Sequence, residues 1–300
     1  MSFVIGVDGG GTSTRAVLLD SSGVELGRAQ VQGGVVAPGA ADTAVQAVDD
    51  AVRQAASEAG LELPGAVLWA GLAGAGREDA RGLVERALTD SGLARSVHVG
   101  TDAEAAFYDA FGESPGVLLI GGTGSIVWAR GDGGEMLRVG GWGRDVGDEG
   151  SGYAIGLAAL RRVLRADDGR EPPTRLTEPV LERCGVSDPT KLVTWFAGAT
   201  KGEVAAIAPL VADAAARLDT GATSIIEGAV QDLEQHVAAA IKRTEPWSGR
   251  APLVLWGGLL AAGGPLRTPM LQALESLPVE VRDVELDPPS GAARLALNQL

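Results

Sequence analysis

The stretch FVIGVDGGGTSTRAVLLDSSG, residues 3–23, decides the fold. An apolar run ends at an aspartate, three glycines and several hydroxyl residues, and the chain then turns apolar again. β-Branched runs broken by turn formers are typical of strands joined by tight turns. Residues 3–31 therefore predict an antiparallel meander of three strands.

The glycine turn of this meander is a candidate anion site. A Rossmann or Walker loop leads into a helix, and the Walker loop carries a lysine. Here the chain re-enters a strand, and no lysine precedes Lys191. Glycines at a hairpin tip let successive N–H groups converge on an anion. A plain tight turn is the competing interpretation. The candidate donors are Gly9, Gly10, Gly11, Thr12, Ser13 and Thr14.

The plan of the opening is repeated at residues 117–139, VLLIGGTGSIVWARGDGGEMLRV. An apolar strand again runs into a glycine-hydroxyl turn, with Gly122, Thr123 and Gly124, and returns as a strand. Such internal similarity predicts two halves built on one template. Two such tips facing each other would grip a nucleotide polyphosphate. Asp8, at the end of the first strand, would then hold Mg²⁺, which prefers few carboxylates and keeps its waters.

The rest of the chain alternates strands and helices, which predicts an α/β fold with parallel additions to each sheet. We expect a helix over 42–60, ending at Gly60, and a strand over 279–286. The predicted lobes are 1–115 and 116–288, the second with a helical insertion. The last helix, 289–300, is expected to pack back on the first lobe.

Composition excludes several classes of protein. The formal charge of −14 and the absence of a basic block argue against nucleic-acid binding. A single cysteine, Cys184, and two histidines, His98 and His236, provide neither a disulfide nor a zinc site. The start MSFVIGVDGG does not resemble a signal peptide, and no apolar run is long enough to cross a bilayer. We expect a cytoplasmic protein that does not bind membranes.

A candidate catalytic acid lies in VHVGTDAEAAFYDAF, residues 97–111. Thr101 and Glu104 have capping-box spacing, which leaves the Asp102 carboxylate free in the first turn of a helix. Asp102 either interacts with the helix dipole alone or accepts a hydroxyl proton during phosphoryl transfer. The dipole is expected to favour the ionised carboxylate.

Two further glycine-rich segments are candidate binding segments. GGWGRDVGDEGSGYAIG, residues 140–156, combines acids with an aromatic residue before a helix, which favours sugar binding by Asp148 and Glu149 with Trp142 as a wall. In WGGLLAAGG, residues 256–264, the small residues Gly257 and Gly258 would admit an adenine ring, although helix capping also explains them.

Together these motifs resemble the actin, sugar kinase and heat-shock chaperone superfamily. More narrowly, the chain resembles the BadF/BadG/BcrA/BcrD ATPase-type family, which includes N-acetylglucosamine kinase and glucosamine kinase. The motifs span nearly the whole chain. They are GVDGGGTSTR, GLAGAGR at 71–77, GTDAEAA at 100–106, IGGTGSIV, the 140–156 segment and GGLLAAGG.

The resemblance implies two ribonuclease-H-like lobes with ATP and Mg²⁺ in a cleft, and transfer of the γ-phosphate to the 6-hydroxyl of N-acetylglucosamine or glucosamine. It implies that Asp102 is catalytic and binds substrate. It also implies that Asp8 is the acid of the first phosphate turn, that Gly122 and Thr123 form the second turn, with Gly122 also reaching the substrate, and that Trp142 and Asp148 bind the sugar. A homodimer is common among such proteins.

One feature departs from this family pattern and keeps other functions open. Related sugar kinases usually carry a sugar-binding asparagine where this chain has QGGVVAPGAADTA, residues 32–44, with no asparagine. The alternatives are an ATPase acting on water and a nucleotide-dependent binding or regulatory protein. The activator branch of the family, which ligates a cluster through cysteines, is excluded by the single Cys184.

Overall fold

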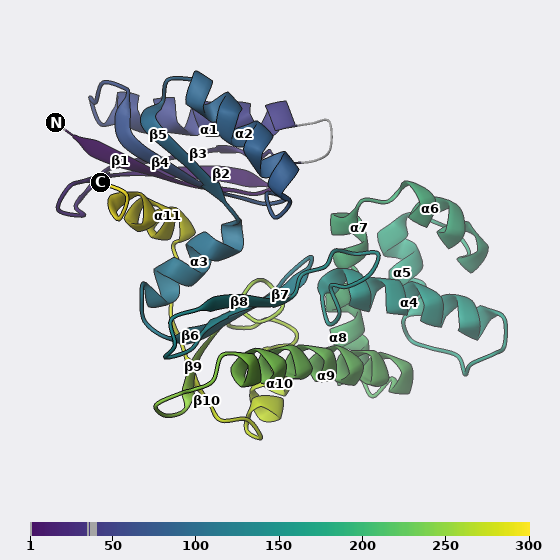
Figure 1. The fold of residues 1–300 in the computed structure, drawn as a ribbon. Helices are drawn as coiled ribbons and strands as arrows, with labels where there is room; N and C mark the ends of the chain where they lie inside the picture. The colour runs from purple at the N-terminus through teal and green to yellow at the C-terminus, as the bar shows by residue number, and fades with distance from the viewer. Residues whose placement is uncertain (1, 35, 37–40) are drawn as a thin grey trace. The chain divides into compact units, whose positions relative to one another are not determined.

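The computed structural model describes residues 2–34, 36 and 41–300, and its first sheet is built on the opening meander. The strands are β1 (Phe3–Gly9), β2 (Ser13–Asp20), β3 (Glu25–Gln32), β4 (Gly65–Leu72) and β5 (Ala94–Gly100). Their order is β3-β2-β1-β4-β5 (Figure 1). β1, β2 and β3 pair antiparallel, as the sequence predicts, whereas β4 and β5 add in parallel.

Helices cover both faces of this sheet. Alternate residues of β1, Phe3, Ile5 and Val7, pack in one core with α1 (Ala41–Glu58) and α2 (Glu78–Asp90). The opposite face is covered by α11 (Pro288–Leu297), which lies beside α3 (Asp102–Phe111) although the two are far apart in sequence (Figure 1). α11 approaches β1 so closely that a Cβ on Gly6 would lie 2.1 Å from the Ala293 nitrogen.

The second sheet has the same topology as the first. It contains β6 (Gly116–Gly121), β7 (Ser125–Arg130), β8 (Met136–Gly140), β9 (Ala251–Trp256) and β10 (Val279–Arg282), in the order β10-β9-β6-β7-β8. Its first three strands are antiparallel and the other two are added in parallel. The predictions of an α/β fold and of one template used twice are confirmed. The strand predicted over 279–286 is wrong beyond Arg282, because the chain leaves this unit after Asp283.

A group of helices packs against the second sheet around one core. It comprises α4 (Gly152–Asp167), α5 (Thr177–Cys184), η1 (Pro189–Lys191), α6 (Leu192–Gly198), α7 (Lys201–Ala205), α8 (Ala208–Ala216), α9 (Thr220–Arg243) and α10 (Arg267–Leu274).

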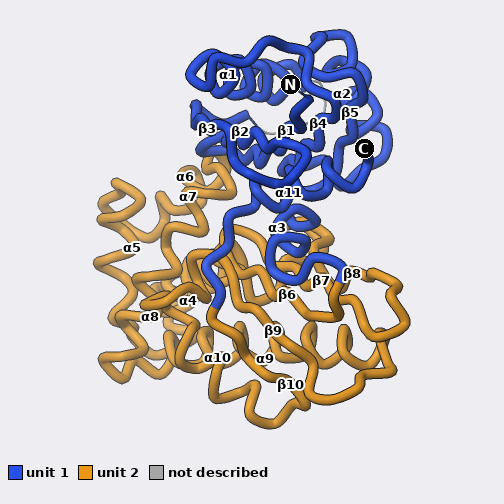
Figure 2. Tube along the Cα trace, turned by 90° about the vertical axis from the view of Figure 1, so that its left-hand side faces the viewer, with its two compact units in different colours: residues 1–113, 284–300 blue, residues 114–283 orange. Residues whose placement is uncertain are grey.

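The chain forms two compact units (Figure 2). One contains Met1–Glu113 and Val284–Leu300, and the other contains Ser114–Asp283. Each has its own sheet and core. None of the described helices has the length and apolar character needed to cross a membrane.

Candidate active site

The first glycine turn joins β1 to β2 and presents an exposed tip. Gly11 and Thr12 are exposed, and the described backbone offers no acceptor for their N–H groups. The base of the turn is held by a hydrogen bond from the Gly10 N–H to the Ser13 carbonyl, 3.0 Å. Thr14 is only 1% exposed and its hydroxyl has no partner in the described structure, so it lies behind the tip. Among the predicted hydroxyl donors, the more accessible are therefore Thr12 and Ser13.

Asp8 lies at the end of β1, on the face of the sheet that α11 covers. Its Oδ2 accepts a hydrogen bond from the Arg15 guanidinium at 2.6 Å, and only 13% of its side chain is exposed. Asp8 and Arg15 are opposite each other across the β1–β2 hairpin. Burial raises the pKa of the Asp8 carboxyl, although Arg15 opposes this effect. The Arg15 guanidinium therefore offsets part of the cost of burying the Asp8 carboxylate beside the turn.

Asp102 begins α3 and is positioned by the predicted capping box. The Thr101 hydroxyl accepts from the Glu104 N–H, while the Glu104 carboxylate accepts from the Thr101 N–H. The backbone N–H groups at the start of the helix lower the pKa of Asp102, the direction predicted for the helix dipole, but the net shift is upward. Burial and the charge of Asp8 together raise the pKa of Asp102 to about 6, because desolvation exceeds the effect of the backbone N–H donors.

The donors near Asp8 fit a magnesium ion that is held mainly by phosphate. Within the described ranges, no group of three or more histidine, cysteine or acidic side chains is placed to bind a metal. Mg²⁺ is commonly bound by one or two carboxylates together with substrate phosphates. Asp8, the predicted magnesium ligand, would be one such carboxylate, and its charge raises the pKa of Asp102.

The second glycine turn, Gly121–Ser125, is bound to the helix and loop beside it. The first N–H of α4, from Gly152, donates to the Gly122 carbonyl at 2.8 Å. On another side, the Leu259 N–H donates to the Gly121 carbonyl at 3.0 Å. Gly257 has a φ of +95°, and a Cβ there would lie 2.5 Å from the Gly121 oxygen, whereas Gly258 faces open space. Two segments predicted to bind ATP therefore lie side by side in this unit.

An ion pair with a buried carboxylate lies against this second turn. Asp148 is 4% exposed, and its Oδ2 accepts from the Lys201 ammonium at 2.6 Å. A Cβ on Gly124 would lie 2.9 Å from the Lys201 nitrogen and 3.2 Å from the Asp148 Oδ1. Asp148 also has a φ of +58°, which is unusual for a residue with a side chain. Asp148, the predicted sugar ligand, is thus already paired with a cation beside the second glycine turn.

The other two predicted sugar residues are more exposed. Trp142 is 65% exposed, and the Arg138 guanidinium lies 4.5 Å from the centre of its ring. Glu149 is about half exposed, with a carboxylate oxygen 3.7 Å from Nε2 of His236. The His236 Nδ1 donates to the Asp232 carbonyl at 2.6 Å, so this histidine is held in place beside Glu149.

Comparison with known proteins identifies the family. A model of the BadF/BadG/BcrA/BcrD ATPase family matches residues 5–296. The chain belongs to this family. N-acetyl-D-glucosamine kinase of Dictyostelium discoideum is 31% identical, with 98% of this chain and 97% of that protein aligned. N-acetylmuramic acid/N-acetylglucosamine kinase of Clostridium acetobutylicum is 28% identical over 87% of this chain and 86% of that protein.

A solved structure of the same kind supports the fold. A protein of Chromobacterium violaceum, assigned as an N-acetylglucosamine kinase, superimposes with a TM-score of 0.83 at 31% identity and covers 99% of both chains. The predicted family and the two-sheet, actin-like fold class are confirmed.

In this member of the ATPase family, the predicted residues form one group in each unit. Asp8, Asp102 and the first turn belong to one unit, while the second turn, Gly257 and Asp148 belong to the other. The cleft that would join the two groups stays a prediction. Residues 35 and 37–40, part of the segment that lacks the asparagine, lie outside the described residues.

Sequence reasoning missed Arg15 and Lys201. Arg15 was open to prediction, because a hairpin centred on the glycine tip pairs it with Asp8. Lys201 gave no such signal, since 53 residues separate it from Asp148.

Proposed function

We propose that this protein is an ATP-dependent kinase that transfers the γ-phosphate of ATP to the 6-hydroxyl of an amino sugar, N-acetylglucosamine or glucosamine. The observation that carries the proposal is the repeated glycine turn, present at the same place in two sheets of identical topology. The proposal is supported by relatives named as amino-sugar kinases that align over most of the chain.

In the proposed reaction Asp102 is the general base. Its carboxylate accepts the proton of the sugar hydroxyl as that oxygen bonds to the γ-phosphorus, and the bond between the γ-phosphorus and the bridging oxygen breaks to release ADP. A pKa of about 6 suits this role, since a base works best when its pKa lies near the working pH. The capping box around Thr101 holds the carboxylate in position.

The two turns would bind the nucleotide. The N–H groups of Gly11, Thr12, Thr123 and Gly124, which have no acceptor in the described backbone, would donate to phosphate oxygens. The open side of Gly258 would admit the adenine. Asp8 would hold Mg²⁺, which neutralises charge on the β and γ phosphates. Asp148 and Glu149, with Trp142 alongside, would bind the sugar.

The test is ADP formation from ATP and Mg²⁺ with and without N-acetylglucosamine, glucosamine and N-acetylmuramic acid. Sugar-dependent ADP with a phosphorylated sugar supports the kinase, sugar-independent ADP indicates an ATPase, and no ADP indicates a binding protein. Asp102→Asn should lower turnover by roughly 10³-fold and leave ATP affinity within about twofold. Asp90→Asn, an exposed carboxylate on α2, is the matched control. Unchanged turnover in Asp102→Asn would contradict the assignment.

A further inference from the structure

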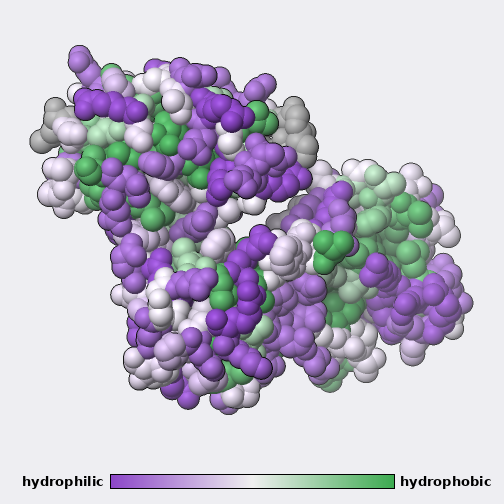
Figure 3. All heavy atoms as spheres, in the orientation of Figure 1, coloured by the Kyte–Doolittle hydropathy of each residue, from purple (hydrophilic) through white to green (hydrophobic). Residues whose placement is uncertain are grey.

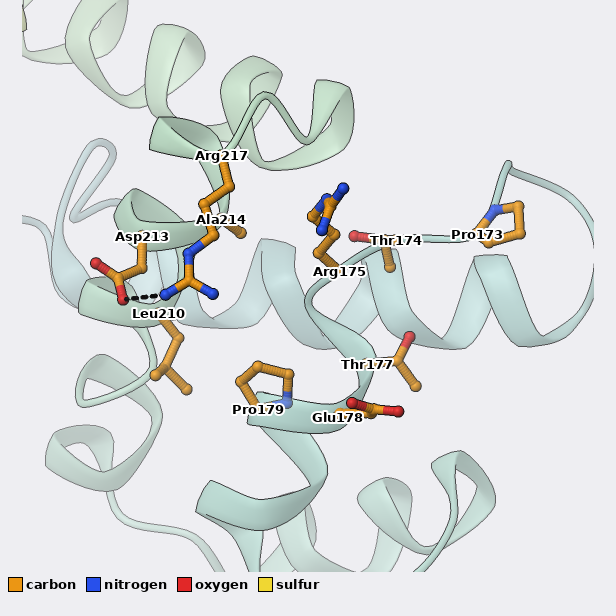
Figure 4. Close-up of a pocket in the computed structure, with 10 residues that line it drawn as sticks. All are labelled: Pro173, Thr174, Arg175, Thr177, Glu178, Pro179, Leu210, Asp213, Ala214 and Arg217. Atoms are coloured by element: carbon orange, nitrogen blue, oxygen red, sulfur yellow. Dashed lines mark ion pairs between the residues drawn. The ribbon is translucent and has the colours of Figure 1, made fainter.

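Two neighbouring cavities lie among the helices of the second unit, and they differ in charge. The first, of about 690 Å³, lies between α5 and α8. Its lining includes Arg175 and Arg217 but also Glu178 and Asp213, and Figure 4 shows Asp213 beside Arg217. Because the lining charges balance, this cavity selects no class of ligand.

The second cavity is strongly positive. It has a volume of about 470 Å³ and lies between α4, the connection after it and the start of α9. Three arginines line it, Arg161, Arg162 and Arg165, against one lining acid, Glu171, in a chain whose net charge is −14. Asp219, outside the lining, also attracts Arg162. Figure 3 shows a strongly hydrophilic surface over the end of α4 and the connection that follows. We call this cavity the arginine pocket.

The arginines of this pocket are only partly neutralised. Arg162 and Arg165 share the carboxylate of Glu171. Arg161 has no hydrogen-bond or ion-pair partner in the described part of the chain. Arg161 and Arg165 are four residues apart on α4, and like charges at this spacing repel each other. Arg165 lies in the last turn of α4, where a cation stabilises the helix dipole, but Arg161 lies too far from the end for this explanation.

Arg162 is fixed in the wall of the pocket. Besides Glu171, it donates to the Pro172 carbonyl at 3.1 Å. A Cβ on Gly221 of α9 would lie 2.3 Å from its Nε, so the guanidinium packs directly against the helix backbone. That Nε is buried and has no described partner. The arrangement therefore keeps guanidinium groups together at a cost in stability.

We propose that the arginine pocket binds the phosphate group of a phosphorylated sugar. Guanidinium groups match phosphate oxygens with paired hydrogen bonds. The Thr220 and Ser224 hydroxyls on the opposite wall have no described partner and are available to a sugar. The volume lies in the range of small-molecule sites and exceeds what a phosphate alone would fill. The pocket is distinct from the proposed active site and does not depend on kinase activity.

The experiment is calorimetric titration of the nucleotide-free protein with inorganic phosphate and with glucosamine 6-phosphate. Arg161→Gln and Arg165→Gln should each weaken binding of both probes by roughly tenfold, because each removes a charge-assisted hydrogen bond. Arg183→Gln, an exposed arginine on α5 that does not line the pocket, is the matched control and should bind as the wild type does. Asp102→Asn should leave this binding unchanged, which separates the pocket from product bound at the active site.

Four outcomes would overturn the proposal. The first is the absence of saturable binding to the wild type, and the second is an equal loss of affinity in Arg161→Gln and Arg183→Gln. The third is a loss of affinity in Asp102→Asn without one in Arg161→Gln. The fourth is equal affinity for the sugar phosphate and for inorganic phosphate. Circular dichroism of each variant checks that the helices are intact.

Discussion

The two glycine turns occupy equivalent places in sheets of the same topology, yet their surroundings differ. The first has an exposed tip with two acids behind it, Asp8 paired with Arg15 and Asp102 at the start of α3. The Ala73 and Gly33 N–H groups donate to the Gly9 and Thr12 carbonyls of this first turn. The second turn accepts instead from the N–H groups of Leu259 and of Gly152, the first residue of α4, and the Asp148–Lys201 pair lies against it. Both turns are thus held by neighbouring backbone, but the first lies near two acids, whereas the second lies against the start of a helix and a single acid–lysine pair.

This difference suggests a division of labour between the units. A buried carboxylate with a raised pKa is typical of a catalytic base, so we infer that the first unit provides the chemistry. The second turn contacts the start of α4 and lies beside the Lys201 ammonium, an arrangement preorganised for anions, so we infer that the second unit contributes mainly to binding of the phosphates and the sugar.

The largest expected effect follows from the packing of the second turn. Gly257→Ala should lower the free energy of unfolding by about 2 to 4 kcal/mol, because alanine disfavours a positive φ and its Cβ would overlap the Gly121 carbonyl. Gly10→Ala changes the tip of the first turn, where the nearest contact would be an ordinary 3.8 Å to the Ser13 oxygen. Its cost should stay below about 0.5 kcal/mol. Urea unfolding of both variants measures the difference, and equal costs would contradict the predicted effect of packing at Gly257.

The sheets could be predicted from the sequence, since alternating apolar runs and glycine turns act over a few residues. The repeat at 117–139 gave the second sheet for the same reason. The end of β10 could not be predicted, because apolar and acidic residues alternate from Asp283 to Asp287, as in a strand, although the chain crosses to the other unit there.

The residues of the site were easier to predict than their partners. Glycine and acid motifs indicated Asp8, Asp102 and Asp148, and Thr101 was correctly predicted as a cap. Their electrostatics depend on tertiary packing, which burial of Asp102 and the long-range contact of Lys201 illustrate. Sequence spacing carries no information of that kind.

The second prediction concerns the acid pair of the first unit. The pKa of Asp102 in the folded protein, about 6, lies above its ordinary value of 3.8, so the folded protein binds this proton more tightly than the unfolded chain does. Wild-type stability should therefore fall as the pH rises from about 4 through 6. Asp102→Asn lacks this loss and should be more stable than the wild type by about 2 kcal/mol at pH 8, with little difference below about pH 4. Unfolding of the ligand-free proteins across this range provides the measurement. Asp90→Asn should show no such pH dependence of the difference.

The third prediction concerns the cation of the second unit. Lys201→Met leaves the buried Asp148 without its partner and should cost about 1 to 2 kcal/mol, a value reduced because 34% of the lysine side chain is exposed. If the lysine also faces the nucleotide, the KM for ATP should rise roughly tenfold.

Two further variants separate these effects. Lys201→Met combined with Asp148→Asn should recover stability, because no buried charge is then unpaired, but it should not recover the KM for ATP. Lys242→Met, an exposed lysine in the last turn of α9, is the control. An unchanged KM in Lys201→Met would limit Lys201 to a structural role and weaken the contrast between the two turns.

The smallest effect is expected behind the first turn. The Thr14 hydroxyl is buried without a partner, so Thr14→Val, which keeps the shape of the side chain, should raise the free energy of unfolding by about 0.5 to 1 kcal/mol. The KM for ATP should be unchanged if only the exposed tip contacts phosphate, whereas Ser13→Ala should raise it. A rise in KM of tenfold or more in Thr14→Val would mean that this hydroxyl reaches the nucleotide. The buried side chain behind the tip would then belong to the binding surface of the first turn, together with the exposed groups of the tip.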